Sequence, residues 1–201
     1  MEQSQLIELL RTLQPEEREQ VMQFATLSFV NNGKLKAQVI PLLKICLNYL
    51  SSENHEELGS NETFEVLFPG QAFVEGKLEK LRVEAHKVVR IFLTMKHYLR
   101  AENEFQQVLD FSEEMRNRGL ITRFQKSLSK LQRLQEETVW KNETFFHRQF
   151  ILEYKKHQEE SLHNRVKGDL NIPNVFYALE LHGQLNRLAL LNRLLLQQKV
   201  A

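Results

Sequence analysis

The stretch from Pro173 to Lys199 constrains the fold more than any other part of the sequence. Its residues favour one continuous helix, which at 1.5 Å per residue is about 40 Å long. Apolar side chains surround most of the circumference of its second half instead of forming one stripe; they are Leu185, Leu188, Ala189, Leu190, Leu191, Leu194, Leu195 and Leu196. Other helices normally cover such a helix on several sides, and Arg187, Asn192 and Arg193 exclude a membrane span. The preceding chain is therefore predicted to supply helices that cover it.

The rest of the chain also has the composition and periodicity of helices. Helix-forming residues dominate, only seven Gly and four Pro occur in 201 residues, and runs of β-branched residues are missing. The clearest amphipathic stripe belongs to a helix predicted over Val74 to Leu99, and its members are Leu78, Leu81, Ala85, Val88, Phe92, Met95 and Leu99. The other predicted helices cover residues 4–12, 15–31, 35–50, 60–68, 102–118, 120–139 and 142–157. The sequence therefore predicts an all-α fold of about eight helices.

The breaks between these helices are short, and short breaks favour antiparallel hairpins. We expect one all-helical domain over residues 1–201, with an N-terminal helical cap at 1–70 and an irregular array of antiparallel helical hairpins at 71–201. The C-terminal two-thirds is expected to look like a solenoid of tetratricopeptide-like units. The signature residues of that repeat are absent, so the array is predicted to be irregular.

Five short phrases occur in an order that is similar to a known family. They are Leu13-Gln14-Pro15-Glu16-Glu17, Phe29-Val30-Asn31-Asn32, Leu67-Phe68-Pro69-Gly70, Arg118-Gly119-Leu120 and Phe176-Tyr177-Ala178-Leu179-Glu180-Leu181. Together they resemble the N-terminal part of a family of uncharacterised all-helical proteins of Bacteroidetes bacteria. The resemblance covers nearly the whole chain and implies architecture alone, a helical cap followed by a helical-repeat array. It implies no active site. Members of the family continue into further hairpins, so the chain is either a fragment or a short member.

Charge is unevenly distributed along the chain although the net charge is only +1. Residues 1–75 carry five basic and eleven acidic residues, a net charge of −6, whereas residues 76–201 carry twenty-two and fifteen, a net charge of +7. The two parts could attract each other within one molecule, which we favour, or they could bind different partners. The first residues lack the pattern of an export signal, so we expect a cytoplasmic protein. Cys46 lies in an apolar run and is predicted to be buried.

No pattern typical of catalysis or of a cofactor site is present. None of the seven histidines forms the i, i+4 pair with an adjacent Glu that a helical zinc protease uses, and a single cysteine excludes cysteine-based zinc sites. No Gly-x-Ser-x-Gly sequence occurs. We therefore expect a protein that is not an enzyme and that has no cofactor. Trp140 falls at a helix junction, and we interpret it as local core in preference to a binding anchor.

The sharpest polar feature is a basic helical face. Spacings of three and four place four side chains on one side of a helix, and two lysines of the preceding long helix could add to it; the six are Arg123, Lys126, Lys130, Arg133, Lys80 and Lys87. One function of such a face is to bind nucleic-acid phosphates. The interpretation that we favour is a solvated helix surface or a partner for the acidic N-terminal third.

Self-association is the second candidate surface. If the last helix lacks its cover, the side that carries Leu190 and Leu194 would be exposed, and pairing with a second copy would bury it. Our leading hypothesis is a non-enzymatic helical scaffold that binds another, unknown protein and forms a homodimer through the C-terminal helix. The alternative is a nucleic-acid-associated protein that uses the basic face. Neither hypothesis involves a membrane.

Overall fold

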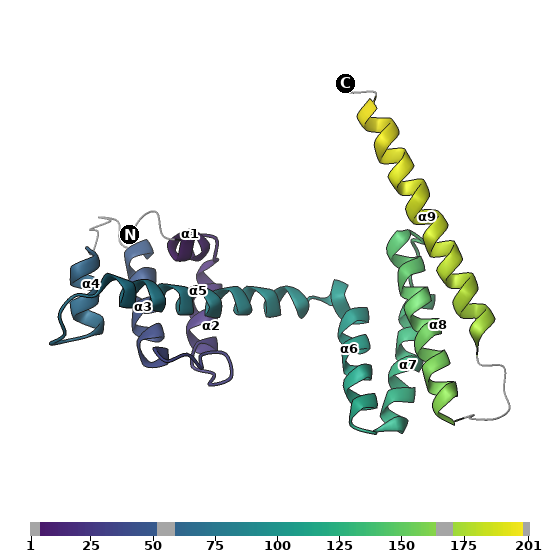
Figure 1. Ribbon diagram of the computed structural model, residues 1–201, viewed down its shortest axis with the longest axis horizontal. Helices are drawn as coiled ribbons and strands as arrows, with labels where there is room; N and C mark the ends of the chain where they lie inside the picture. Colours follow the sequence, from purple (N-terminus) through teal and green to yellow (C-terminus); the bar gives the residue numbers. More distant parts are fainter. Residues whose placement is uncertain (1–4, 52–58, 164–170, 199–201) are drawn as a thin grey trace. The chain divides into compact units, whose positions relative to one another are not determined.

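The chain folds into helices throughout the residues that can be described. The computed structural model describes residues 5–51, 59–163 and 171–198, and within them it contains nine α-helices, one short 3-10 helix and no strand. The all-α prediction is confirmed. The helices fall into two compact units, Met1–Leu99 and Arg100–Ala201 (Figure 1). The predicted division at residue 70 lies inside the first unit, and the assignment of the whole chain to one domain stays a prediction.

The first unit is organised around its last helix, α5. Its helices are α1 (Gln5–Arg11), α2 (Pro15–Phe24), α3 (Lys36–Ser51), α4 (Ser60–Leu67) and α5 (Glu75–Tyr98). The other four helices all contact α5 (Figure 1). The predicted stripe of α5 is buried from Leu78 to Phe92, but Met95 and Leu99 are 38% and 64% exposed. The stripe therefore continues past the part of α5 that the other helices cover. The sequence predicted that the C-terminal helix would be surrounded by other helices, but in the first unit it is α5 that has this position.

The helix α2 is shorter than the sequence predicted. It ends at Phe24, and the chain then turns before α3 begins. The side-chain amide of Asn31 is buried and donates hydrogen bonds to the carbonyl oxygens of Ala25 and Lys36, at 3.1 and 3.0 Å. An amide that satisfies backbone carbonyls in this way competes with the helix. The apolar residues after Phe24 continue the helical pattern, so periodicity alone overestimated the length of α2.

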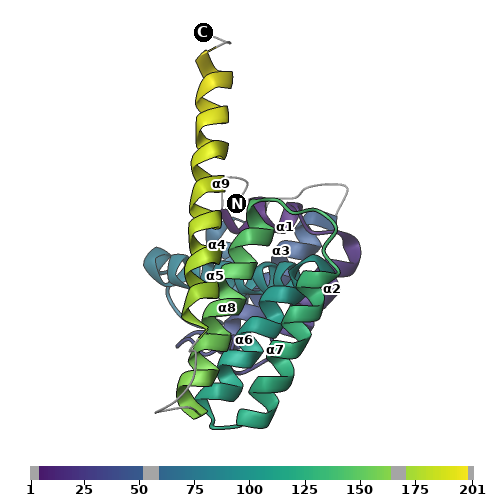
Figure 2. The same ribbon diagram turned by 90° about the vertical axis from the view of Figure 1, so that its right-hand side faces the viewer.

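The second unit consists of consecutive antiparallel helices. After a 3-10 turn at Ala101–Asn103, its helices are α6 (Glu104–Asn117), α7 (Ile121–Glu136), α8 (Glu143–His163) and α9 (Ile172–Gln198). Each helix packs against the next, α6 on α7, α7 on α8 and α8 on α9 (Figure 2). A small buried core joins the first three helices of this series, and its members are Phe105, Leu109, Met115, Phe124, Leu128, Leu131 and Leu152.

One helix boundary in this unit follows a local sequence signal, and another does not. Gly119 has φ +71°, and the N–H of Leu120 donates to the carbonyl oxygen of Met115 at 2.9 Å, which closes α6 where the sequence predicted. The polar run from Gln158 to Asn171 is predicted to be a connection or a frayed helix end. Residues 158–163 instead continue α8, and residues 164–170 lie outside the described residues. Glu, Gln and Lys form helices well even without an apolar stripe. The predicted last residue of α9, Lys199, lies outside the described residues.

An ion-pair bridge links α6 to α8 across this unit. The Glu113 carboxylate of α6 accepts hydrogen bonds from the Arg116 guanidinium of the same helix and from the Lys155 ammonium of α8. The hydrogen bond from Arg116, followed by that from Lys155, lowers the pKa of Glu113 below its ordinary value. The Glu113 side chain is 34% exposed, so solvent weakens the interaction.

We expect Glu113→Gln to lower the stability of the second unit by about 1 kcal/mol or less at neutral pH. Because the folded-state pKa is lowered, the stabilisation is fully present above the unfolded value of about 4.5 and is lost as the pH falls through the folded value. The difference in the free energy of unfolding between wild type and variant should therefore shrink below pH 4.5. Urea titrations across the acid range would measure it. Glu114→Gln is the matched control, because Glu114 pairs with Arg118 one helix turn away. An equal pH effect there would contradict the prediction.

Candidate interaction surfaces of the second unit

The beginning of α9 is fixed firmly to α8. The Asn171 amide donates hydrogen bonds to the backbone carbonyl and the carboxylate of the buried Glu153, at 3.2 and 2.8 Å. About two helix turns farther along, Ala178 is 4% exposed. One turn beyond it, the rings of His147 and His182 lie 4.9 Å apart between their centroids. These contacts fix the register of an antiparallel pair, in which residue 147 of α8 lies beside residue 182 of α9.

The end of α9 extends beyond its partner. Because α8 begins at Glu143, four residues before His147, its first residue lies level with about residue 186 of α9. Residues 187–198 therefore project past α8, and both ribbon views show this (Figures 1 and 2). We call residues 187–198 the free end of α9. The prediction that other helices of the chain cover this segment was wrong for the residues that the structure describes.

The free end is rich in exposed leucine. Six of its twelve residues are leucines that are 55–64% exposed, namely Leu188, Leu190, Leu191, Leu194, Leu195 and Leu196. Burying a fully exposed large apolar side chain contributes about 1.5–3 kcal/mol of favourable free energy. Burying these six leucines, each about half exposed, would therefore contribute on the order of 5–10 kcal/mol. A contiguous apolar surface of this kind marks an interaction site in a folded protein.

Five of the six exposed leucines form two groups on different sides of the helix, and Leu196 lies apart from both. Leu190 and Leu194, which the sequence singled out, are one turn apart and are both exposed. Leu188, Leu191 and Leu195 form a second stripe with spacings of three and four. This stripe was not predicted, because leucines around most of the circumference of the helix obscure it. Its heptad spacing was the signal that could have found it.

The turn between α7 and α8 exposes the only tryptophan of the chain. Val139 and Trp140 are 83% and 80% exposed. The turn is held at both ends, since the Thr138 hydroxyl donates to the carbonyl oxygen of Leu134 at 2.8 Å, and the Asn142 side chain accepts from the backbone N–H of Phe145 at 3.0 Å. The Asn142 side chain thus caps the start of α8. The interpretation of Trp140 as local core was wrong.

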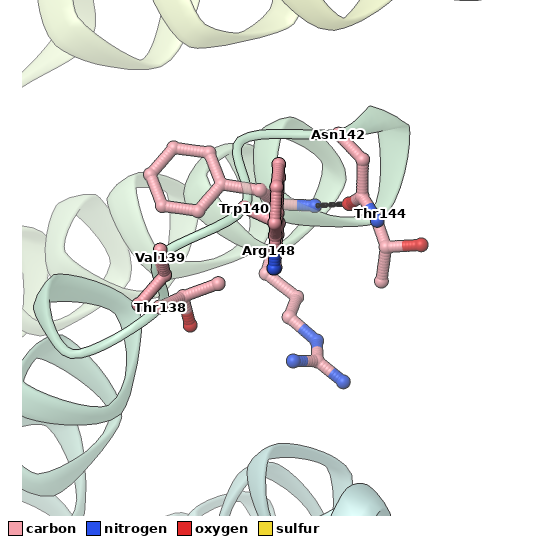
Figure 3. Close-up of a pocket in the computed structure, with 7 residues that line it drawn as sticks. Thr138, Val139, Trp140, Asn142, Thr144 and Arg148 are labelled. Carbon is pink, nitrogen blue, oxygen red and sulfur yellow. Dashed lines mark hydrogen bonds between the residues drawn. The ribbon is translucent and has the colours of Figure 1, made fainter.

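A shallow hollow lies beside Trp140. Figure 3 shows Thr138 and Val139 on one side of Trp140 and Asn142 and Thr144 on the other, with Arg148 reaching out from the same region. The hollow has a volume of about 470 Å³. The Arg148 guanidinium lies 5.0 Å from the centroid of the Phe105 ring, so it already makes a cation–π contact within the unit. Tryptophan and arginine at an open surface are typical of protein–protein contacts.

The basic face is partly neutralised by acidic neighbours. Lys130 pairs with Glu104 of α6 at 2.7 Å between Nζ and Oε1, and Arg133 pairs with Glu137 at 3.6 Å between Nε and Oε1. Arg123 and Lys126 are exposed on the same helix. Lys80 and Lys87 belong to α5 and are exposed in the first unit.

The pair between Lys130 and Glu104 could not be predicted from local spacing, because Glu104 is 26 residues from Lys130 along the chain. Both ion pairs reduce the positive potential that a phosphate backbone would meet. The interpretation of this face as a nucleic-acid site stays a prediction, which gel shifts with duplex DNA and single-stranded RNA at low salt would test.

The described residues form no metal-binding cluster and no membrane-spanning helix. Among residues 5–51, 59–163 and 171–198, no group of three or more His, Cys, Asp or Glu side chains could hold a metal ion. Within those ranges, none of the helices has the length and apolarity needed to cross a membrane. No protein-family model, curated protein or solved structure matches the chain. The resemblance to the Bacteroidetes family accordingly stays a prediction.

Proposed function

We propose that this protein is a helical scaffold that binds other protein molecules, and that it acts as a binding module instead of an enzyme. The observation that carries the proposal is the exposed leucine surface on the free end of α9. Exposure of this surface costs on the order of 5–10 kcal/mol relative to full burial, so a partner that covers it gains a substantial driving force. The surface is built on a helix whose base Asn171 and Glu153 hold in place.

The Trp140 turn supports the same proposal. It lies at the end of the second unit from which the free end of α9 projects (Figures 1 and 2). A rigid aromatic side chain that is already exposed loses little conformational entropy when it binds, which is why tryptophan is frequent among the residues that dominate interface energies. The scaffold therefore offers an apolar helix and an aromatic anchor at one end. The four antiparallel helices behind them would act as the support, in the manner of a tetratricopeptide-like hairpin stack.

Photo-crosslinking from the free end tests the proposal. A benzophenone amino acid placed at Leu191 in the full-length chain, in native cells, should give ultraviolet-dependent adducts that contain a second protein molecule. The same probe at the exposed Lys126 on α7 is the control and should give no such adduct. Absence of any protein adduct at position 191 would contradict the scaffold function. Adducts with nucleic acid from position 126 would instead support the nucleic-acid alternative.

A further inference from the structure

We propose that the free end of α9 pairs with the free end of α9 in a second copy of this chain, through the stripe formed by Leu188, Leu191 and Leu195. The inference rests on the proposed function and names the partner of the same surface. The three side chains are 57%, 55% and 57% exposed. Alternating spacings of three and four residues are those of the apolar positions in a two-helix coiled coil.

The stripe continues along the outer side of α9 toward its beginning. One heptad earlier, the equivalent positions are Leu181 and Gln184, and Tyr177 precedes them with the same spacing. Tyr177 is 69% exposed, whereas Leu181 is half-buried at the groove with α8. The pairing surface is thus longer than the free end, and its most apolar part is the part that α8 does not reach.

The charges of the free end permit pairing between identical copies. Its only charged residues are Arg187 and Arg193. At 100° per residue, Arg193 lies about 140–160° around the helix from the three leucines, so it points away from a partner on the stripe. Arg187 lies at the edge of the stripe, where a long side chain can stay in water. Two copies can therefore meet along the stripe without burying like charges.

The area of the surface agrees with what a specific dimer needs. The three leucines of the stripe, the flanking Leu194 and the exposed Tyr177, taken on two copies, offer on the order of 1,000 Å² of surface. Specific interfaces bury at least about 1,000 Å² in total. The surface is at the lower limit, so we expect association in the micromolar range and not a permanent dimer.

Sedimentation equilibrium of the full-length chain tests the pairing. Between low-micromolar and several-hundred-micromolar protein, the mass should rise from 23.8 kDa toward twice that value. Leu191→Glu places a charge in the stripe and should weaken association at least about 100-fold, because a buried unpaired carboxylate is strongly disfavoured. Leu190→Glu is the matched control, since Leu190 is equally exposed on the neighbouring side of the helix, and it should change association by less than about threefold. Circular dichroism would verify that both variants remain helical.

The outcomes separate this inference from the proposed function. A wild-type chain that stays monomeric, a dimer that survives Leu191→Glu, or equal loss of association in both variants would overturn the pairing. If the chain is monomeric but crosslinking from position 191 captures another protein, the scaffold function stands and the second-copy partner is wrong. If neither association nor a crosslink occurs, both proposals fail.

Discussion

Replacing Phe124 by alanine is expected to destabilise the second unit strongly while the first unit keeps its stability. Phe124 is fully buried in α7, at the centre of a core that contains only seven buried hydrophobic residues. Removal of a buried phenylalanine costs about 3–5 kcal/mol. A domain of about 100 residues has a total stability of roughly 5–15 kcal/mol, and a small core places the second unit toward the lower end. The substitution should thus remove most of its stability.

Calorimetry of the full-length variant would measure this effect. The transition of the second unit should move down by roughly 15–30 °C, at about 4–8 °C per kcal/mol for a unit of this size. The transition of the first unit, whose separate core has twenty-two buried members, should stay in place. Phe111→Ala is the control, because Phe111 is 48% exposed in α6 of the same unit. Equal shifts of all transitions in the Phe124 variant would show that the two cores are not independent.

Cys46 is expected to be almost inert toward thiol reagents in the folded protein. Its side chain is 1% exposed in α3, and burial raises the pKa of the thiol to about 11. The thiolate is the reactive form, so at pH 8 only about 0.1% of the thiol would be ionised, against roughly a quarter for an ordinary cysteine. Burial blocks access as well. Labelling should therefore be at least about three orders of magnitude slower than in the unfolded chain.

A time course of labelling with a chromogenic disulfide, in native and in unfolding buffer, would give these rates. The sign of the pKa shift predicts that the native rate rises about tenfold per pH unit well above pH 8. Val83→Cys in a Cys46→Ala background is the matched control, because Val83 is 60% exposed on α5 of the same unit, and it should react at the rate of an ordinary thiol. Rapid labelling of Cys46 in the native wild type would contradict its burial. In the Phe124→Ala variant Cys46 should remain protected, which tests the independence of the two cores by a second method.

Features of the fold that depend on neighbouring residues were predictable from the sequence. The buried positions of α5, the end of α6 at Gly119 and the cap at Asn142 all depend on residues within one or two helical turns. Hydrophobic periodicity and capping residues are signals that depend on residues within this short distance along the chain. The location of Cys46 in an apolar run predicted its burial for the same reason.

Features that depend on distant residues were not predictable. Periodicity shows that the second half of α9 is apolar, but it does not show where α8 begins relative to it, and that register leaves the free end uncovered. Spacing placed Lys130 on a basic face without revealing that Glu104 pairs with it. The exposure of Trp140 depends on the packing of α7 and α8, which leaves the turn between them without cover. These three errors concern which residues lie opposite a side chain in the fold, and the local sequence does not show that.

The position of Trp140 also gives the molecule a built-in optical reporter. Since it is the only tryptophan of the chain, its fluorescence comes from a single point, and its 80% exposure leaves the indole in water. Any macromolecule that covers the turn would move the emission toward shorter wavelength without an added dye. Contact at this end of the second unit can therefore be followed in unmodified protein.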